Sequence, residues 1–196
     1  VTGVQTCALP ILSPFWFSYA GHGGAIPDKN QDEKDGQDEC FMPMDYKTTG
    51  VILDDEIHTI LASFHKQSRI MGLIDACHSG SLFDLPYQST YESSGLKHWT
   101  NQQTVWSGPE VLLLSACQDQ ELASETVTAE SKPGGAMTTT FWTVIEAQKE
   151  QTMYCSMLLT ALRATLIKNG FKKQWPQLSA TVPLVKAAFM MPYMER

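Results

Sequence analysis

The sequence predicts an α/β fold in which helices cover both faces of a mostly parallel central sheet. Three apolar segments of strand length support this prediction: FWFSY at 15–19, RIMGLIDAC at 69–77 and PEVLLLSAC at 109–117. Nearly every position in them is apolar, as in parallel strands that are buried on both faces. Helical patterns alternate with these segments, and 196 residues suffice to bury one sizeable core, so we expect one domain of this class.

The segments between the first two predicted strands differ in composition. The first strand is followed by AGHGG at 20–24, which predicts a glycine-rich loop. Residues 28–39 are acidic and lack apolar periodicity, so we predict a solvated loop there. A helix is predicted from Asp54 to about 65–68, because acids occupy its first turn and apolar residues share one face. That face comprises Ile57, Ile60, Leu61 and Phe64.

The remaining segments complete the alternation of strands and helices. Residues 87–107 are rich in Ser, Thr, Gln and Asn, and predict an exposed connection before the third strand. A loop is predicted at 131–135, followed by helices at 138–149 and 152–168, with Gly170 ending the second of these. In such folds, ligands bind beyond the carboxyl ends of the parallel strands.

The composition argues against several kinds of partner. A net charge of −7 and a pI of about 5.1 provide no basic field to attract nucleic acid or an anionic membrane. No apolar segment reaches the roughly 20 residues of a membrane-spanning helix. We therefore expect neither nucleic acid nor membrane as a partner. The chain is also expected to be a monomer. The cysteines are odd in number and widely spaced, which favours reduced thiols in the cytoplasm, and no zinc-site spacing occurs.

Two of the three predicted strands end in a reactive side chain flanked by glycine. These are His22 in GHGG and Cys77 in DACHSG, which neighbouring parallel strands would deliver to one edge of the sheet. A cysteine attacks as a thiolate, and a histidine within hydrogen-bond reach can take its proton at neutral pH. Flanking glycines leave room for a substrate backbone. We expect the backbone N–H groups of Gly23 and Cys77 to hold an oxyanion.

Several ordered motifs resemble those of type I metacaspases, the caspase-like peptidases of fungi, plants and protists. They are SYAGHGG, DEKDGQDE, MPMDYKTTGVILDDE, DACHSGSLFDLPY, SACQDQ and WPQLSA, and they extend from about Phe15 to Ser179. The resemblance implies a caspase-like α/β/α sandwich and a His22/Cys77 dyad that cleaves peptide bonds after Arg or Lys through a thioester. The separation of 55 residues between these two is close to the roughly 50 in caspases.

The resemblance also implies how the chain is organised. We expect residues 1–14 to be a non-native or disordered start, and 15–196 to be the catalytic domain, lacking the first strands of its sheet. Within it, a large-subunit-like part would extend to about residue 90, a linker would occupy about 90–108, and a small-subunit-like part would occupy 109–196.

Recognition of a basic substrate residue is assigned to Asp75. It lies two residues before Cys77, and alternate residues of a strand share a face, so its carboxylate can pair with Arg or Lys in the S1 pocket. In the metacaspases a serine often lies two residues before the catalytic histidine and joins this pocket. Here that position is Ala20, so one polar contact is missing.

A calcium site is likewise implied by the resemblance. Carboxylate oxygens suit Ca²⁺, and the ion is expected to order the loop after Cys77 without taking part in the chemistry. The acids that match the pattern of the metacaspases are Asp38, Asp54, Asp55 and Asp84. We reject an EF-hand, because Glu33 occupies the position where that loop needs glycine. The acids that match the rest of that loop are Asp28, Asp32 and Glu39, together with Asn30.

Alternatives remain for several of these residues. His78 is a second candidate base, but a sequence neighbour of Cys77 at a strand end points its side chain elsewhere. Cys117 is expected to be a buried structural thiol. Lys97, in the predicted exposed connection, is a candidate self-processing site. The alternative function is an inactive homologue that acts as a binding or regulatory module.

Overall fold

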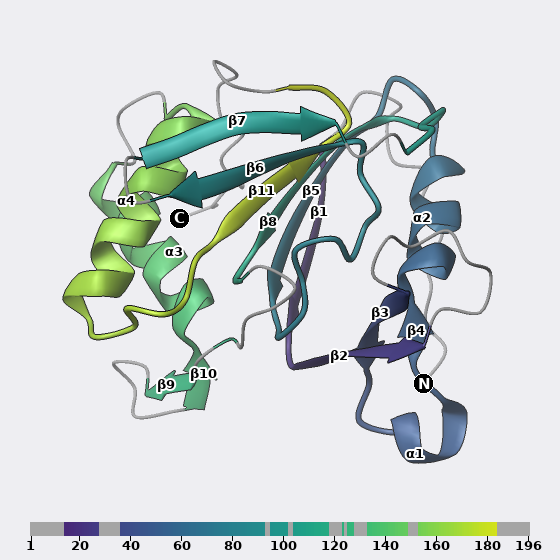
Figure 1. The fold of residues 1–196 in the computed structure, drawn as a ribbon, viewed down its shortest axis with the longest axis horizontal. Helices are drawn as coiled ribbons and strands as arrows, with labels where there is room; N and C mark the ends of the chain where they lie inside the picture. Colours follow the sequence, from purple (N-terminus) through teal and green to yellow (C-terminus); the bar gives the residue numbers. More distant parts are fainter. Residues whose placement is uncertain are drawn as a thin grey trace.

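The computed structural model of the chain describes residues 14–27, 36–92, 95–101, 104–117, 123, 125–127, 133–148 and 153–183. At its centre lies a six-stranded sheet with the order β1-β5-β8-β11-β6-β7 (Figure 1). The strands are β1 (Pro14–Ala20), β5 (Arg69–Asp75), β8 (Glu110–Ser115), β11 (Gln177–Ala180), β6 (Tyr87–Glu92) and β7 (Gly95–Asn101). The start predicted at 1–14 lies outside the described residues, except for Pro14.

The sheet is mixed, with parallel strands on one side. β1, β5 and β8 run parallel, and they coincide with the three strands predicted from apolar segments. β11 runs against both β8 and β6, so β6 points the same way as the parallel strands, whereas β7 runs against β6. Four of the six strands therefore share one direction, which confirms the prediction of a mostly parallel sheet.

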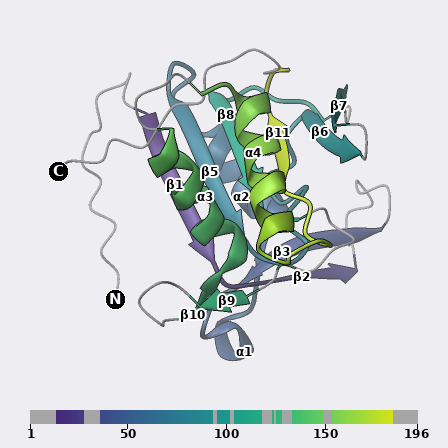
Figure 2. The ribbon, with the colours of Figure 1, turned by 90° about the vertical axis from the view of Figure 1, so that its left-hand side faces the viewer.

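Helices cover both faces of this sheet. They are α2 (Asp54–Ala62) on one face, and α3 (Ala136–Ala147) and α4 (Cys155–Lys168) on the other. Figure 2 shows α3 and α4 in front of the sheet and α2 behind it. Alternation along β5 produces the two cores, because Met71 and Leu73 pack with α3 and α4, whereas Ile70 and Ile74 pack with α2. The predicted α/β/α sandwich is confirmed.

Smaller elements gather at the carboxyl ends of β1 and β5. One is a three-stranded antiparallel sheet of β2 (His22–Pro27), β3 (Gln37–Met42) and β4 (Ile52–Leu53), with the short helix α1 (Tyr46–Thr49) beside it. The other is the hairpin of β9 (Glu125–Val127) and β10 (Pro133–Gly135), which leads into α3. Both lie at the lower end of the sheet in Figure 1, so they flank the edge where ligands are expected.

Two segments predicted as loops near this edge contain strand residues instead. GHGG does not form a loop, because a bend at Gly21 is followed directly by β2. Asp38 and Glu39 do not lie in a solvated loop either, since they belong to β3 and are only 3% and 4% exposed. The charge pattern was misleading because these acids belong to β3, the central strand of its sheet, which lies between β2 and β4. Residues 28–35, with most of the rejected EF-hand, lie outside the described residues.

The connection predicted at 87–107 is also largely sheet. It contains β6 and β7, which form an antiparallel hairpin whose first strand pairs with β11. Polar residues fit there because their groups are satisfied inside the sheet: the fully buried Ser89 hydroxyl donates to the Leu178 carbonyl and accepts from the Leu178 N–H. Lys97 consequently falls on β7 instead of on an exposed loop.

The predicted helices are present, with shifted ends. α2 ends at Ala62, earlier than predicted, and Ile60 is 58% exposed although the pattern placed it on the buried face. α3 starts at Ala136 and α4 at Cys155, and Gly170 follows α4 with a φ of 94°, as expected of a helix-ending glycine. None of the helices in the described part of the chain has the length and apolar character needed to cross a membrane.

Candidate active site

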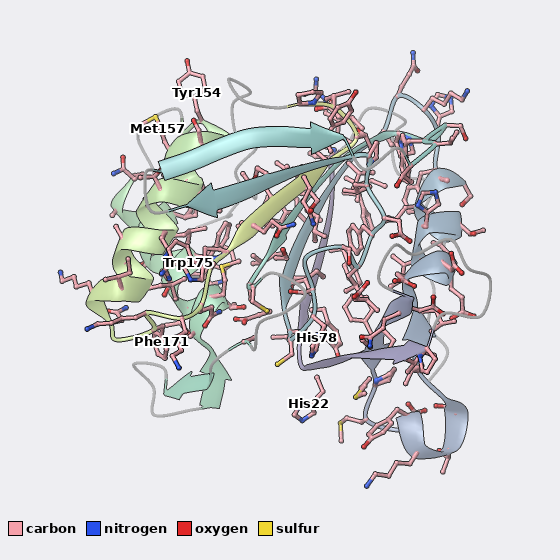
Figure 3. All side chains as sticks on the ribbon, in the orientation of Figure 1. His22, His78, Tyr154, Met157, Phe171 and Trp175 are labelled. Atoms are coloured by element: carbon pink, nitrogen blue, oxygen red, sulfur yellow. The ribbon has the colours of Figure 1, made fainter. Side chains whose placement is uncertain are left out.

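The carboxyl ends of β1 and β5 bring His22 and Cys77 to one edge of the sheet. The two strands are paired in parallel, with Ala20 opposite Asp75 in register. His22 and Cys77 therefore each lie two residues beyond a paired position, as the sequence predicts for adjacent parallel strands. Figure 3 shows the side chains of His22 and His78, the neighbour of Cys77, at this lower end of the sheet.

Backbone contacts hold the histidine segment against the cysteine turn. The Gly21 N–H donates to the Asp75 carbonyl at 3.2 Å. A Cβ atom on Gly23 would lie 2.2 Å from the Cys77 carbonyl oxygen and 3.2 Å from the Ala76 Cβ, so no side chain fits at this position. Glycine at 23 thus permits the start of β2 to touch the turn that carries the thiol.

The Cys77 thiol is half-buried and is hydrogen-bonded to backbone. Its Sγ accepts from the Ala123 N–H at 3.3 Å, and it lies 4.0 Å from the Ala123 carbonyl oxygen. No hydrogen bond joins this thiol to the His22 imidazole, although both residues are among those described. Catalytic hydrogen bonds often tighten only when substrate is bound. Ala123 could not be identified from its residue type, because only its backbone takes part.

The turn after Cys77 has an unusual backbone. His78 has a φ of 51°, in the left-handed region that few residues other than glycine adopt, and such strain is often found at functional sites. Behind the turn lies Cys117, fully buried, whose thiol donates to the Ala76 carbonyl at 3.3 Å. The prediction that Cys117 is a structural thiol is consistent with this position.

Asp75 is the last residue of β5, two residues before Cys77, and it is 4% exposed. Its Oδ2 accepts from the Thr138 N–H at 2.7 Å, at the start of α3. Burial raises the pKa of this carboxyl above its ordinary value, although hydrogen bonds from the first turn of α3 oppose the shift. Ala20, the other residue assigned to S1, is exposed on the neighbouring strand and offers no polar side chain.

The acids assigned to calcium have the right chemistry but do not form a complete site. Asp38 and Asp54 are 3% and 2% exposed, and the Asp54 carboxylate accepts from the N–H groups of Glu39 at 2.7 Å and Asp55 at 3.0 Å. Asp84 lies in the loop after Cys77, with a φ of 45°. Within the described ranges, no three His, Cys, Asp or Glu side chains are grouped so that they could hold one ion. Oxygen donors are available, but this arrangement does not supply a coordination shell.

One acidic residue that the sequence did not assign joins this region to the active-site loop. The Ser81 hydroxyl donates to the Glu39 carboxylate at 2.7 Å, so β3 is connected directly to the segment four residues beyond Cys77. Glu39 is nearly fully buried. The acidic strand and the cysteine turn are therefore parts of one packed unit.

Comparisons with known proteins agree with this geometry. A family model described as metacaspase, peptidase C14 domain, matches residues 13–86, which contain both His22 and Cys77. Metacaspase-1 of Arabidopsis thaliana is 37% identical over 163 residues, covering 79% of this chain and 44% of that protein. Inactive metacaspase-4 of Trypanosoma brucei brucei is 34% identical over 182 residues, covering 86% of this chain and 50% of that protein.

A solved structure supports the fold. The crystal structure of protein GSU0716 from Geobacter sulfurreducens superposes with a TM-score of 0.58 at 24% identity, covering 86% of this chain and 66% of that one. The chain spans about half or less of the length of the two curated relatives above. With the family model, these relatives and the α/β/α sandwich in agreement, the chain belongs to the metacaspase family, the caspase-like cysteine peptidases of family C14.

Proposed function

We propose that this chain is the catalytic part of a cysteine endopeptidase that cleaves after Arg or Lys. The observation that carries the proposal is the packing of Gly23 against the Cys77 carbonyl, because it holds the His22 segment beside a half-buried thiol. Family membership supports the reaction class. A reducing intracellular compartment suits this chemistry, since the four described cysteines are free thiols.

In the proposed reaction, His22 takes the proton of the Cys77 thiol, and the thiolate attacks the carbonyl carbon of the scissile bond. Backbone N–H groups of Gly23 and Cys77 hold the resulting oxyanion. The protonated His22 then gives its proton to the leaving amine as the carbon–nitrogen bond breaks, which forms a thioester on Cys77. Water, deprotonated by His22, hydrolyses the thioester and restores the thiol.

The proposed preference for a basic residue follows from Asp75. This buried carboxylate lies two residues before the nucleophile, and its Oδ1 has no hydrogen-bond partner in the described structure. A guanidinium or ammonium group in the S1 pocket would pair with it through charge-assisted hydrogen bonds. A substrate with Asp at the same position would bring two carboxylates together, so caspase-like cleavage after Asp is disfavoured.

Hydrolysis of peptide reporters tests this proposal. The unmodified chain is expected to cleave reporters that end in Arg or Lys at least about 30-fold faster than matched reporters that end in Gln or Asp, since a buried charge pair is worth roughly 2 kcal/mol or more. The measurement is kcat/KM for each reporter. Equal rates for charged and uncharged reporters would contradict the assigned specificity, and no hydrolysis of any reporter would contradict the activity.

We also propose that calcium stimulates the activity by binding near Asp54. The chemistry of the carboxylates supports this idea. The Ser81–Glu39 hydrogen bond supports it too, because a β3 strand that calcium holds in place would also hold the segment after Cys77 in place. When calcium binds, the assigned acids would move so that their carboxylates coordinate the same ion. This role is regulatory, because no described acid of this group touches Cys77 or His22.

Removal of calcium is expected to lower hydrolysis about tenfold or more, with magnesium unable to restore it. Asp54→Asn should weaken calcium stimulation, whereas Asp45→Asn, at an exposed position before α1, should leave it intact. The readouts are reporter hydrolysis and the calcium-induced rise in Tm, which reports binding independently of activity. Full activity after exhaustive chelation would rule out the calcium role.

A non-catalytic module is the second candidate function. Two observations favour it: the Cys77 thiol bonds to Ala123 with no bond to His22, and one relative carries the name inactive metacaspase-4. Labelling distinguishes the candidates. A catalytic chain should lose hydrolysis in step with alkylation of Cys77 by iodoacetamide, whereas a non-catalytic module should show no hydrolysis before or after alkylation.

A further inference from the structure

Asp75 makes an unusual contact with the N-terminus of helix α3. It shares the face of β5 with Met71 and Leu73, which pack against α3 and α4. From there its Oδ2 accepts the Thr138 N–H at 2.7 Å. The residue at the N-cap of α3 is Gly135, which offers no side chain to accept such a bond. The Asp75 side chain, on strand β5, therefore caps the N-terminus of helix α3.

The second oxygen of the Asp75 carboxylate is not used by the helix. Oδ1 is buried, yet it has no hydrogen-bond partner in the described part of the chain. Buried carboxylate oxygens are normally satisfied, so an orphaned one at a strand end beside the nucleophile marks a place for a donor from a ligand. Oδ2 is thus used by the helix, and Oδ1 remains for a cation.

The space for this carboxylate exists only because residue 135 is glycine. A Cβ atom on Gly135 would lie 1.9 Å from Oδ2 and 2.3 Å from Cγ of Asp75. The backbone at Gly135, with φ −68° and ψ 138°, is one that any residue adopts. Glycine is therefore required by the position of the carboxylate and not by the conformation of the chain.

We propose that Gly135 is a positioning residue for substrate specificity: it leaves room for the Asp75 carboxylate on the N-terminus of α3, with Oδ1 available to a basic substrate side chain. This inference rests on the proposed function. The inference adds to that function a residue 60 positions away from Asp75 in the sequence, which would act through the Asp75 carboxylate. A methyl group at 135 must displace the carboxylate or the helix, and a displaced carboxylate pairs less well with a cation.

Binding of two peptides to chains that carry Cys77→Ala tests the proposal without turnover. One peptide ends in arginine amide, and the other ends in citrulline amide, which has the same shape without the charge. Isothermal titration gives the ratio of their Kd values. We expect the Cys77→Ala chain to prefer arginine at least tenfold, and the added Gly135→Ala change to reduce this preference at least fivefold. If Gly135 has a purely structural role, Gly135→Ala would weaken the binding of both peptides alike and leave the ratio of their Kd values unchanged.

Two further variants on α3 keep the test decisive if Gly135→Ala fails to fold. Thr138→Val removes a hydroxyl that also hydrogen-bonds to Asp75, and it should lower the arginine preference two- to threefold. Thr139→Val, one residue further along, is the matched control and should leave the ratio unchanged. Circular dichroism establishes that each variant is folded. An unchanged ratio in folded Gly135→Ala, or in Thr138→Val if Gly135→Ala does not fold, overturns the proposal.

The outcomes separate this inference from the proposed peptidase activity. If the Cys77→Ala chain prefers arginine and loses that preference with Gly135→Ala, but the unmodified chain hydrolyses nothing, the inference stands and the activity fails. If the unmodified chain hydrolyses Arg reporters and Gly135→Ala binds both peptides with the original ratio, the activity stands and the inference fails. A Cys77→Ala chain that prefers neither peptide overturns the inference.

Discussion

Replacing Cys77 with alanine is expected to lower hydrolysis of Arg and Lys reporters by at least about ten-thousand-fold. In the proposed reaction the Cys77 thiol forms the covalent acyl intermediate, and alanine at this position has no group that can replace it. The Ala123 N–H and the proposed oxyanion donors would remain in place, so only the nucleophile is lost. The measurement is kcat/KM of the unmodified chain and of Cys77→Ala at the same calcium concentration.

Cys117→Ala is the matched control for this change. Cys117 also lies just beyond a parallel strand, β8, but its thiol is fully buried and donates to the Ala76 carbonyl. We expect this variant to keep its activity within about threefold and to lose about 1 kcal/mol of stability, mainly through the small cavity and the lost bond. Residual hydrolysis by Cys77→Ala, or a comparable loss in Cys117→Ala, would refute the assignment of the nucleophile.

The placement of His22 and Cys77 at one edge of the sheet could be predicted because its signals are local. An apolar strand followed by glycine and a reactive residue occurs twice, and parallel pairing then aligns the two ends, as the register of Ala20 with Asp75 now shows. Likewise, the nearly continuous apolar character of the segments that form β5 and β8 predicted helices on both faces, and the two cores are present. In each case the residues of one short segment predict whether that segment is buried, without information from segments distant in the sequence.

Features that depend on distant partners could not be predicted. The carboxylate of the buried Glu39 accepts a hydrogen bond from Ser81, 42 residues later, a partner that the local sequence does not reveal. Similarly, Ser89 enters the sheet because of its bonds with Leu178. Ala123 contributes a backbone N–H, which no residue type reveals. Composition alone therefore assigned these polar segments to the surface.

Replacing Asp75 with asparagine is expected to reduce kcat/KM for Arg and Lys reporters by between about 30-fold and several thousand-fold, the cost of removing one partner of a buried charge pair. Citrulline reporters should be nearly unaffected, because asparagine keeps the shape of the site. Its amide oxygen can still accept the Thr138 N–H, so α3 remains capped. Asp75→Ala is the contrasting variant, since it leaves that N–H without a partner and should also lose about 1–3 kcal/mol of stability.

The pH dependence of stability gives an independent test of the buried charge. Burial raises the pKa of Asp75 above its ordinary value of 3.8, so the folded chain still holds this proton in a range of pH where the unfolded chain has released it. Stability from this group is therefore present at low pH and falls as the pH rises through the raised pKa. Asp75→Asn lacks this titration, so its Tm relative to the unmodified chain should increase from about pH 3.5 to pH 7. A constant difference in Tm across that range would mean that the Asp75 carboxylate is not buried as an unpaired charge, and the role of Oδ1 in recognising a basic substrate would lose its physical basis.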